Sequence, residues 1–143
     1  MGAPAPEDRE ECAPGKQLRL LDVELAVWRV APGASIPRSI LEPERPLPFL
    51  SVTRLPTEIS IIAPSALAPP TSGVERGWRA LVMVGPLDFS LIGVLKEALD
   101  PLASEGLSVM ALSTFETDCI LVRQDDLDRA ADALTRAGYQ FVD

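Results

Sequence analysis

The second half of the chain alternates short apolar runs with two amphipathic segments, in an order that few folds satisfy. Strands are expected at residues 78–84 (WRALVMV), 107–113, 118–123 and 139–142, and helices at residues 90–105 and 125–137. The order is βαββαβ, which is the split βαβ pattern of ferredoxin-like domains. We therefore predict an α+β fold, with an antiparallel sheet and helices on one face.

Both expected helices have clear start and stop signals. The apolar stripe of the first comprises Leu91, Val94, Leu95, Ala98, Leu99 and Leu102. Asp88 or Ser90 is the expected N-cap, Gly106 the stop, and Pro101 predicts a kink or break near Leu99 or Asp100. For the second helix, Asp125 is the expected N-cap and Gly138 the stop, with an apolar face of Leu127, Ala130, Ala131 and Leu134.

The first half is a shorter version of the same pattern. Strands are expected at residues 18–30, 49–54 and 58–63. Between the first two, Pro32, Pro37, Pro43, Pro46 and Pro48 allow only a short helical turn, at Arg38 to Leu41. The predicted division is a disordered tail at 1–16, a truncated unit at 17–66, a linker at 67–77 and a complete unit at 78–143.

An internal repeat links the two units. Residues 53–63 (TRLPTEISIIA) align without a gap on residues 113–123 (STFETDCILVR), at a constant offset of 60. Thr57 falls on Thr117 and Glu58 on Asp118, and apolar residues follow in both segments. Two such units side by side are expected to share one continuous sheet.

The amino-acid composition argues against several classes of function. A net charge of −8 argues against nucleic-acid binding and against an anionic membrane surface. The chain has no histidine, which excludes His-based catalysis and His-ligated metal sites. Cys12 and Cys119 are far apart, so neither a disulfide nor a zinc site is expected. No cofactor, metal, transmembrane helix or signal peptide is expected, and a cytoplasmic location is the default.

The loop before the first helix has the character of an anion site. In residues 85–94 a strand end leads directly onto a helix, and Gly93 is expected in its first turn. Free backbone N–H groups there can bind a small anionic group. A glycine inside a helix costs roughly 1 kcal/mol relative to alanine, so we expect close approach of a ligand or backbone at Gly93.

The segment S-T-F-x-T-D (Ser113 to Asp118), followed by an apolar strand, and the loop GPLDFSLIGVL resemble ACT domains. Over residues 18–143 the chain is similar to small stand-alone tandem ACT proteins of bacteria, and to half of a CASTOR-type cytosolic arginine sensor. That resemblance implies an allosteric regulatory protein whose ligand, an amino acid or related small molecule, binds where two ACT units meet. It also implies possible homodimers through sheet edges or helices.

The resemblance also implies roles for particular residues. Backbone N–H groups of the loop and first turn would hold a ligand carboxylate, at Asp88, Ser90, Leu91, Ile92, Gly93 and Val94. Thr114 and Phe115 would form a pocket wall, and Asp118 would face an ammonium or side-chain cation. From the first unit, Ser51, Val52 and Thr53 would form the facing wall. Leu91 stands where the arginine sensors have an acidic residue, which leaves the identity of the amino acid open.

Each of these residues also has a structural interpretation. Asp118 can equally be a polar residue at a strand start, and Thr114 with Thr117 can be ordinary turn chemistry. Three functional hypotheses follow: an amino-acid sensor, a structural or protein-interaction module with a degenerate site, and an enzyme. The enzyme hypothesis is the weakest, because the chain has no nucleophile motif, phosphate loop or metal cluster.

Overall fold

The structure is a computed structural model that describes residues 15–143. Its strands are β1 (Gln17–Leu20), β2 (Leu25–Val30), β3 (Ser51–Leu55), β4 (Glu58–Pro64), β5 (Glu75–Met83), β6 (Val109–Ser113), β7 (Asp118–Arg123) and β8 (Gln140–Val142). Its helices are α1 (Arg38–Leu41), α2 (Val94–Ser104) and α3 (Leu127–Arg136), with 3-10 turns η2 (Ser65–Leu67) and η3 (Gln124–Asp126). The expectations for residues 1–14, including Cys12, lie outside the described residues.

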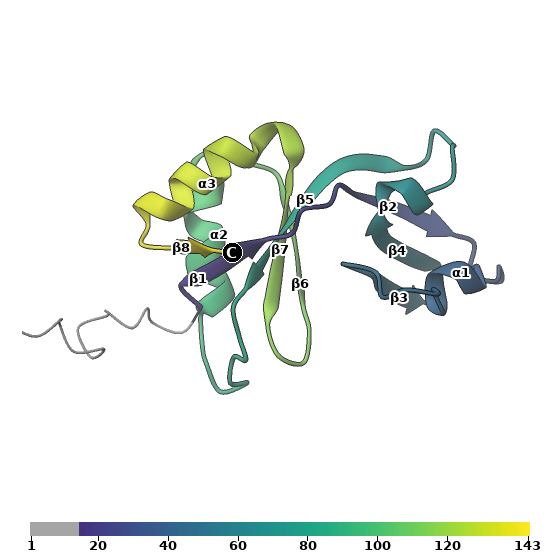
Figure 1. Ribbon diagram of the computed structural model, residues 1–143, viewed down its shortest axis with the longest axis horizontal. Helices are drawn as coiled ribbons and strands as arrows, with labels where there is room; N and C mark the ends of the chain where they lie inside the picture. Colours follow the sequence, from purple (N-terminus) through teal and green to yellow (C-terminus); the bar gives the residue numbers. More distant parts are fainter. Residues whose placement is uncertain (1–14) are drawn as a thin grey trace, which may run out of the picture.

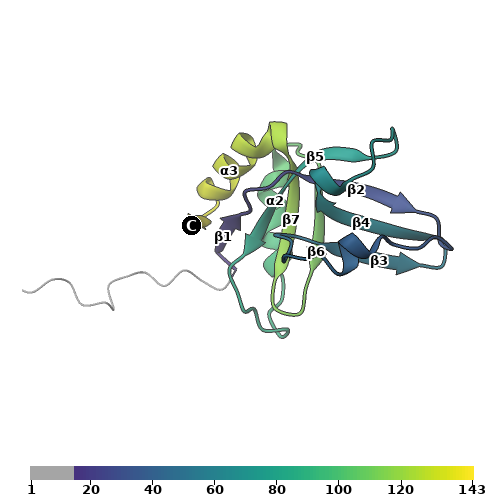
Figure 2. The ribbon, with the colours of Figure 1, turned by 45° about the vertical axis from the view of Figure 1, so that its right-hand side comes forward.

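Strand β5 joins the two halves into one 8-stranded sheet, as predicted. One edge of β5 pairs with β2 near Trp78 and with β1 near Met83, while its other edge pairs with β7. The sheet therefore runs from β3 through β4, β2, β5 and β7 to β6, with β1 and β8 beside the second half of β5. Figures 1 and 2 show β5 crossing from the helical part of the molecule to β2–β4.

The strand expected at residues 18–30 is interrupted, and its first part lies away from the β2–β4 end of the sheet. β1 lies between β5, to which it is antiparallel, and β8, to which it is parallel. The chain bends after β1, where Leu21 N–H donates to the Ala80 carbonyl and Arg79 Nη2 donates to the Leu21 carbonyl. Residues 17–20 thus pair within the sheet of the second half. Apolar and polar residues alternate on both sides of the bend, so the sequence pattern did not indicate that β1 and β2 pair with different strands.

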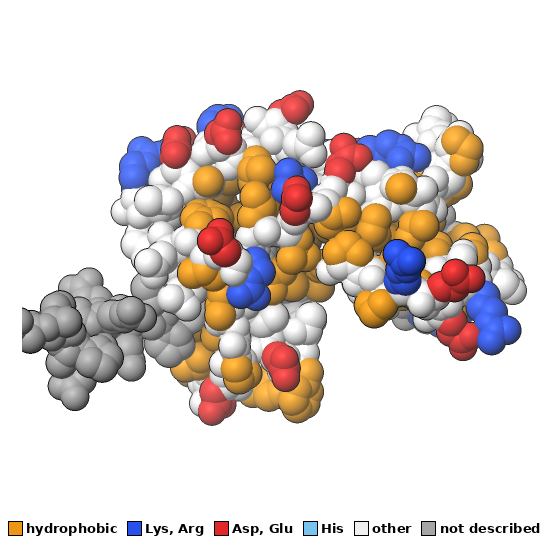
Figure 3. All heavy atoms as spheres, in the orientation of Figure 1, with side chains coloured by type: hydrophobic (Ala, Val, Ile, Leu, Met, Phe, Trp, Pro, Cys, Tyr) orange, Lys and Arg blue, Asp and Glu red, His pale blue; other side chains and the backbone are white. Residues whose placement is uncertain are grey.

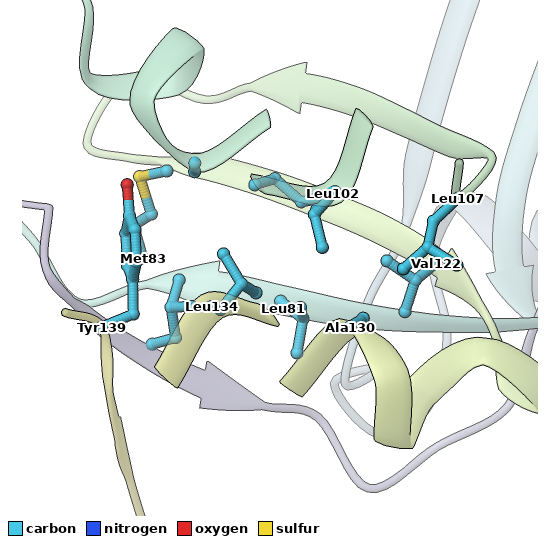
Figure 4. Close-up of a cluster of buried hydrophobic side chains, with 11 residues drawn as sticks. Leu81, Met83, Leu102, Leu107, Val122, Ala130, Leu134 and Tyr139 are labelled. Atoms are coloured by element: carbon cyan, nitrogen blue, oxygen red, sulfur yellow. The ribbon is translucent and has the colours of Figure 1, made fainter. Parts of the chain in front are cut away.

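Helices α2 and α3 cover one face of the second half. A buried apolar cluster joins Leu81 and Met83 of β5 and Val122 of β7 to Leu102 of α2 and Leu134 of α3 (Figure 4). Tyr139, which follows α3, closes one side of this cluster. The predicted arrangement of both helices on one face is confirmed.

Two further clusters complete the core. The first lies between β2, β4 and the short helix α1, and contains Trp28, Ile40 and Ile61. The second lies on the sheet face without α2 and α3, and joins Trp78, Ala80, Cys119 and Leu121 to residues of β2, β4 and β6. Met110 and Leu112 of β6 are half-buried members of that second cluster.

Helix α2 begins four residues later than expected. Gly93 is its N-cap, with a left-handed φ of +78° rather than a helical conformation, and no side chain caps the helix. Asp88 and Ser90 instead form a turn, in which Ser90 N–H donates to Asp88 Oδ1 and Leu91 N–H donates to the Asp88 carbonyl. The prediction of Asp88 or Ser90 as N-cap is therefore wrong. Of the two alternatives expected at Gly93, close approach of backbone is also wrong, because an added Cβ there would meet no protein atom within 4 Å, while close approach of a ligand stays a prediction.

Helix α2 is not broken at its proline, and α3 also begins late. α2 continues through Pro101 to Ser104 because its packing against the core holds Ala98 and Leu102 fully buried on either side of the proline. α3 begins at Leu127, since residues 124–126 form a 3-10 turn, and Asp125 is therefore not its N-cap. Gly106 and Gly138 follow the two helices at positive φ, as the predicted stops require.

The internal repeat has a gap that the sequence alignment did not show. Glu58 and Asp118 begin β4 and β7 at the predicted offset of 60, but they pair with Leu55 and Ser113, which are 58 apart. The turn of the second hairpin, residues 114–117, is therefore two residues longer than the turn at residues 56–57. These additional residues form part of the cavity wall described below.

Candidate functional site

Two loops of the second half meet at one end of the sheet. The helix loop, residues 84–93, connects β5 to α2, and the hairpin loop, residues 114–117, connects β6 to β7. Both extend beyond the sheet at the bottom of Figure 1. Because β5 and β7 are neighbours, the loops that begin at their ends lie side by side.

Hydrogen bonds hold the two loops together at their base. Leu87 N–H donates to the Glu116 carbonyl at 2.7 Å, and Thr117 Oγ1 donates to the Met83 carbonyl at 2.6 Å. An added Cβ at Gly85 would lie 2.9 Å from the Glu116 oxygen, so only glycine allows this approach. The loops are therefore fixed relative to each other where they leave the sheet.

Thr114 organises the hairpin loop internally. Its hydroxyl donates to the Thr117 carbonyl at 3.2 Å and accepts from the backbone N–H of Thr117 at 3.2 Å. The Thr114 N–H also donates to the Thr117 carbonyl, at 2.8 Å. Phe115 and Glu116 form the tip of this closed turn. The interpretation of Thr114 with Thr117 as turn chemistry is confirmed.

The helix loop presents the first turn of α2. The first hydrogen bond within this helix runs from Glu97 N–H to the Gly93 carbonyl. The N–H groups of Val94, Leu95 and Lys96 therefore have no acceptor within the helix, and they carry the positive end of its dipole. Val94 lies at the boundary between this turn and the cavity.

A cavity of about 150 Å³ lies between the two loops. Its lining comprises Leu87, Asp88, Phe89, Leu91 and Val94 from the helix side, and Ser113, Thr114, Phe115, Glu116, Thr117 and Asp118 from the hairpin. Enclosed sites for drug-sized ligands have volumes of roughly 300 Å³ or more. The cavity therefore suits a small ligand, or part of a site that another surface completes.

Aromatic side chains stand at the rim. Phe89 and Phe115 are 74% and 79% exposed, and Ile92 beside them is 97% exposed. Apolar side chains gather with acidic ones at the lower end of the molecule in Figure 3. Large apolar groups so exposed on two fixed loops are typical of a binding surface rather than of a core.

The cavity is acidic. Its ionisable lining residues are Asp88, Glu116 and Asp118, and its lining contains no lysine or arginine. Asp118 Oδ1 accepts a hydrogen bond from Ser113 Oγ across the β6–β7 pair. The hydrogen bond from the Ser90 backbone N–H lowers the pKa of Asp88, so this exposed carboxylate is ionised at neutral pH. A positively charged group would be attracted here.

The profile of the ACT domain family matches residues 73–136. The crystal structure of protein Atu0741 from Agobacterium tumefaciens is 30% identical, covers 91% of this chain and 94% of its own, and superposes with a TM-score of 0.80. The chain belongs to the ACT-domain family.

Two more distant structures share the fold of this ACT-domain protein. A Vibrio cholerae protein of unknown function, a possible transport protein, is 18% identical, with a TM-score of 0.62 over 85% of this chain and 89% of its own. The aspartate kinase of Clostridium acetobutylicum, an allosteric enzyme, is 13% identical, with a TM-score of 0.63 over 90% of this chain and 36% of its own.

The ACT fold brings together half of the site residues named from the sequence. Asp88, Leu91, Val94, Thr114, Phe115 and Asp118 line the cavity. Ser90, Ile92 and Gly93 belong to the helix loop but do not line it. Ser51, Val52 and Thr53 lie in β3, at the sheet edge opposite β6, and do not line it either. Within residues 15–143, Ser51 to Thr53 therefore do not face this cavity.

Sequence reasoning did not single out several lining residues of this ACT domain. Phe89 had a signal, because aromatic residues make up only 5% of the chain and this one lies in the loop between a predicted strand and a predicted helix. Ser113 belongs to the segment that carries the family resemblance but was given no role, and Glu116 had no signal, since their place in the wall depends on the hairpin register and on the longer turn.

In the part of the chain that the structure describes, no group of acidic or cysteine side chains could hold a metal ion. Within the same residues, no helix is both long and apolar enough to cross a membrane. Cys119 is buried in β7, and its burial raises the pKa of its thiol, so it is a core residue of the ACT domain.

Proposed function

We propose that this ACT-domain protein is a regulatory protein that binds an amino acid in the cavity between the helix loop and the hairpin loop. Membership of the ACT family supports a small-molecule-binding regulatory role, and ACT domains are regulatory rather than catalytic. The aspartate kinase with the same fold is an allosteric enzyme, which is consistent with this role.

One observation carries the proposal: Val94, the first residue of α2, and the carboxylate residue Asp118 line the same cavity. Val94 opens the first turn of α2, whose free N–H groups suit a carboxylate. Asp118 lies in the hairpin wall and suits an ammonium group. An α-amino acid carries both groups on one carbon, so a single small ligand can satisfy both sides.

The residues at the rim of the cavity favour an amino-acid ligand whose side chain is apolar or positively charged. Leu91, Phe89 and Phe115 provide apolar contact, and an aromatic face also attracts a cation. Asp88 and Glu116 would repel an acidic side chain. Glutamate and aspartate are therefore the least suitable ligands among the common amino acids.

A second copy of the chain supplies the facing unit in this proposal. The cavity lies open beside exposed apolar side chains, whereas β3, with Ser51, Val52 and Thr53, lies at the other edge of the same sheet. Ligand bound between copies would favour their assembled arrangement over other arrangements. A binding event becomes a regulatory signal in that way.

The test is thermal unfolding of the protein with each of the twenty amino acids, after unfolding and refolding to remove any bound ligand. At least one amino acid should raise the midpoint, because a ligand specific for the folded state stabilises it. Asp118→Asn should reduce that shift, and Asp128→Asn, on the outer part of α3, should not. The absence of a shift with all twenty would contradict the proposal.

The exposed rim also favours a second candidate, a protein-interaction module without a ligand. Phe89, Ile92 and Phe115 offer apolar surface to another protein even with an empty cavity. The Asp118→Asn variant distinguishes the two candidate functions. It should weaken binding of an amino acid, but it should leave an apolar contact of another protein with these three residues intact.

A further inference from the structure

Helix α2 begins without a side chain to cap it, so packing contacts fix the position of its first turn. Val94 is the first residue of this helix, and its N-cap, Gly93, has no side chain to contribute. The N–H groups that the proposed function assigns to a ligand carboxylate belong to this turn. Their position in the site therefore depends on what packs against Val94.

Gly15, which lies just before β1, packs directly against Val94. Gly15 is buried, and an added Cβ there would lie 2.5 Å from Val94 Cγ1 and 3.8 Å from Met83 Sδ. Carbon atoms in favourable contact are about 3.5–4.0 Å apart, so a side chain at residue 15 would overlap with Val94. The fit of this turn against the N-terminal end of β1 thus requires a glycine.

Neither partner of this contact is free to move away. The Lys16 carbonyl accepts a hydrogen bond from Gln140 N–H at 2.8 Å, which holds the chain beside Gly15 to β8. Val94 is half-buried against the core cluster between the helices and the sheet. A valine in a helix also has one strongly preferred rotamer. A side chain at residue 15 would therefore displace the first turn of α2.

Lys16 makes a second contact with the same turn. Its Nζ lies 3.6 Å from Glu97 Oε2, in the first turn of α2, and 4.3 Å from the ring centroid of Tyr139. The Lys16 side chain is 24% exposed, so this ion pair is partly shielded from water. Residues 15 and 16 together hold the start of α2 against the end of β1.

We infer that Gly15 is a positioning residue of the candidate site. By leaving room for Val94, it sets where the first turn of α2 lies and where its free N–H groups meet a ligand carboxylate. Asp118, the proposed ammonium partner, belongs to β7 on the other side of the cavity, so it should not move with this turn. The inference rests on the proposed function and deepens it, because Gly15 lies outside the cavity lining and yet governs the carboxylate half of the site.

The first experiment needs no ligand and uses amide NMR of the full chain. Gly15→Ala should shift the amide signals of Val94, Leu95 and Lys96. Gly77→Ala is the matched control, because the two glycines have φ values of +80° and +81°, but an added Cβ at Gly77 would meet nothing within 4 Å. Both variants are strained in the left-handed region, so the overlap alone distinguishes them. The control should leave the three amides unchanged.

A double variant keeps the test decisive even if Gly15→Ala does not fold. Val94→Ala removes the methyl group that an added Cβ at residue 15 would meet. Gly15→Ala combined with Val94→Ala should therefore fold, with the amides of Leu95 and Lys96 close to their positions in Val94→Ala alone. A double variant that unfolds, equal amide shifts in both backgrounds, or unchanged amides in Gly15→Ala would overturn the inference.

The last measurement reads the site itself by calorimetric titration. Gly15→Ala should lower the affinity for the amino acid with the largest thermal shift about tenfold, whereas the affinity for the amine that lacks its carboxylate should change less than about twofold. Equal losses for both compounds would show general damage to the cavity and would overturn the inference. If the wild type binds no amino acid, the proposed function fails, while the amide shifts still decide whether Gly15 positions the turn.

Discussion

Phe89 and Phe115 meet edge to face across the two loops of the site, with ring centroids 5.1 Å apart and an interplanar angle of 83°. Each ring comes from a different loop and each is largely exposed. Aromatic pairs in this geometry are favourable beyond the area they bury. Here the pair stands at the cavity rim, where it can contact a ligand and a second copy of the chain.

Phe115→Ala should weaken ligand binding about tenfold, which corresponds to about 1.4 kcal/mol. The free energy of unfolding should fall by no more than about 1 kcal/mol, because the ring is largely exposed and the contact it loses within the chain is the one with Phe89. Isothermal titration and denaturant unfolding measure the two quantities. Leu55→Ala, an exposed apolar truncation at the other end of the sheet, is the control. Equal effects of the two variants on affinity would argue against a role for the aromatic rim.

Asp118→Asn preserves the shape of the side chain but removes its charge. Affinity for an amino acid should fall at least tenfold, since the ligand ammonium loses an ionised acceptor. Ser113 Oγ can still donate to the amide oxygen of the new side chain, so stability should change little. Calorimetric titration against Asp128→Asn provides the comparison. An unchanged affinity would exclude Asp118 as the ammonium partner.

Gly93→Ala should destabilise the protein by roughly 1–2 kcal/mol, because an L-residue is strained in the left-handed region. Gly33→Ala is a matched control, since neither glycine has an atom within 4 Å of an added Cβ and only Gly93 has positive φ. The control should change the free energy of unfolding by less than about 0.5 kcal/mol. Urea unfolding of the two variants measures the difference. Similar losses in both would show that the backbone conformation at Gly93 is not the cause.

Ionisation of the Tyr139 phenol should lower the free energy of unfolding at high pH. Burial, with smaller effects from the charges of Glu97 and Asp100, raises its pKa to about 12. The unfolded value is about 10, so the stabilisation is fully present below pH 10 and is lost as the pH rises through 12. Tyr139 is the single tyrosine, so tyrosinate absorbance reports it directly.

That titration should have its midpoint near pH 12 in the folded protein and near pH 10 in denaturant. Tyr139→Phe should remove the part of the stability loss that occurs between these values. A folded-state midpoint near 10 would show that the phenol is not held in its neutral form by the core.

Local sequence patterns predicted most elements of the second half. The apolar faces of α2 and α3 and the strand that begins at Asp118 follow directly from periodicity and from the glycines after each helix. These features depend on residues close in sequence. The start of α2 was placed too early, because Asp88 and Ser90 are good capping residues that here form a turn of their own.

Long-range pairing could not be predicted in the same way. The alternation of residues 18–30 is identical in kind on both sides of the bend at Leu21, yet β1 pairs with β5 and β8 and β2 pairs with β4 and β5. The position of Ser51 to Thr53 away from the cavity has the same origin. Six of the proposed site residues meet in one cavity because they lie in, or directly after, two loops that neighbouring strands bring together.

The most direct test of the account is an amide NMR titration of the ligand-free protein with the amino acid that gives the largest thermal shift. The largest chemical-shift changes should fall on the amides of Val94, Leu95 and Lys96 and on those of residues 114–118. Changes centred on β2–β4, or no saturable change at all, would contradict the claim that this cavity is an amino-acid site.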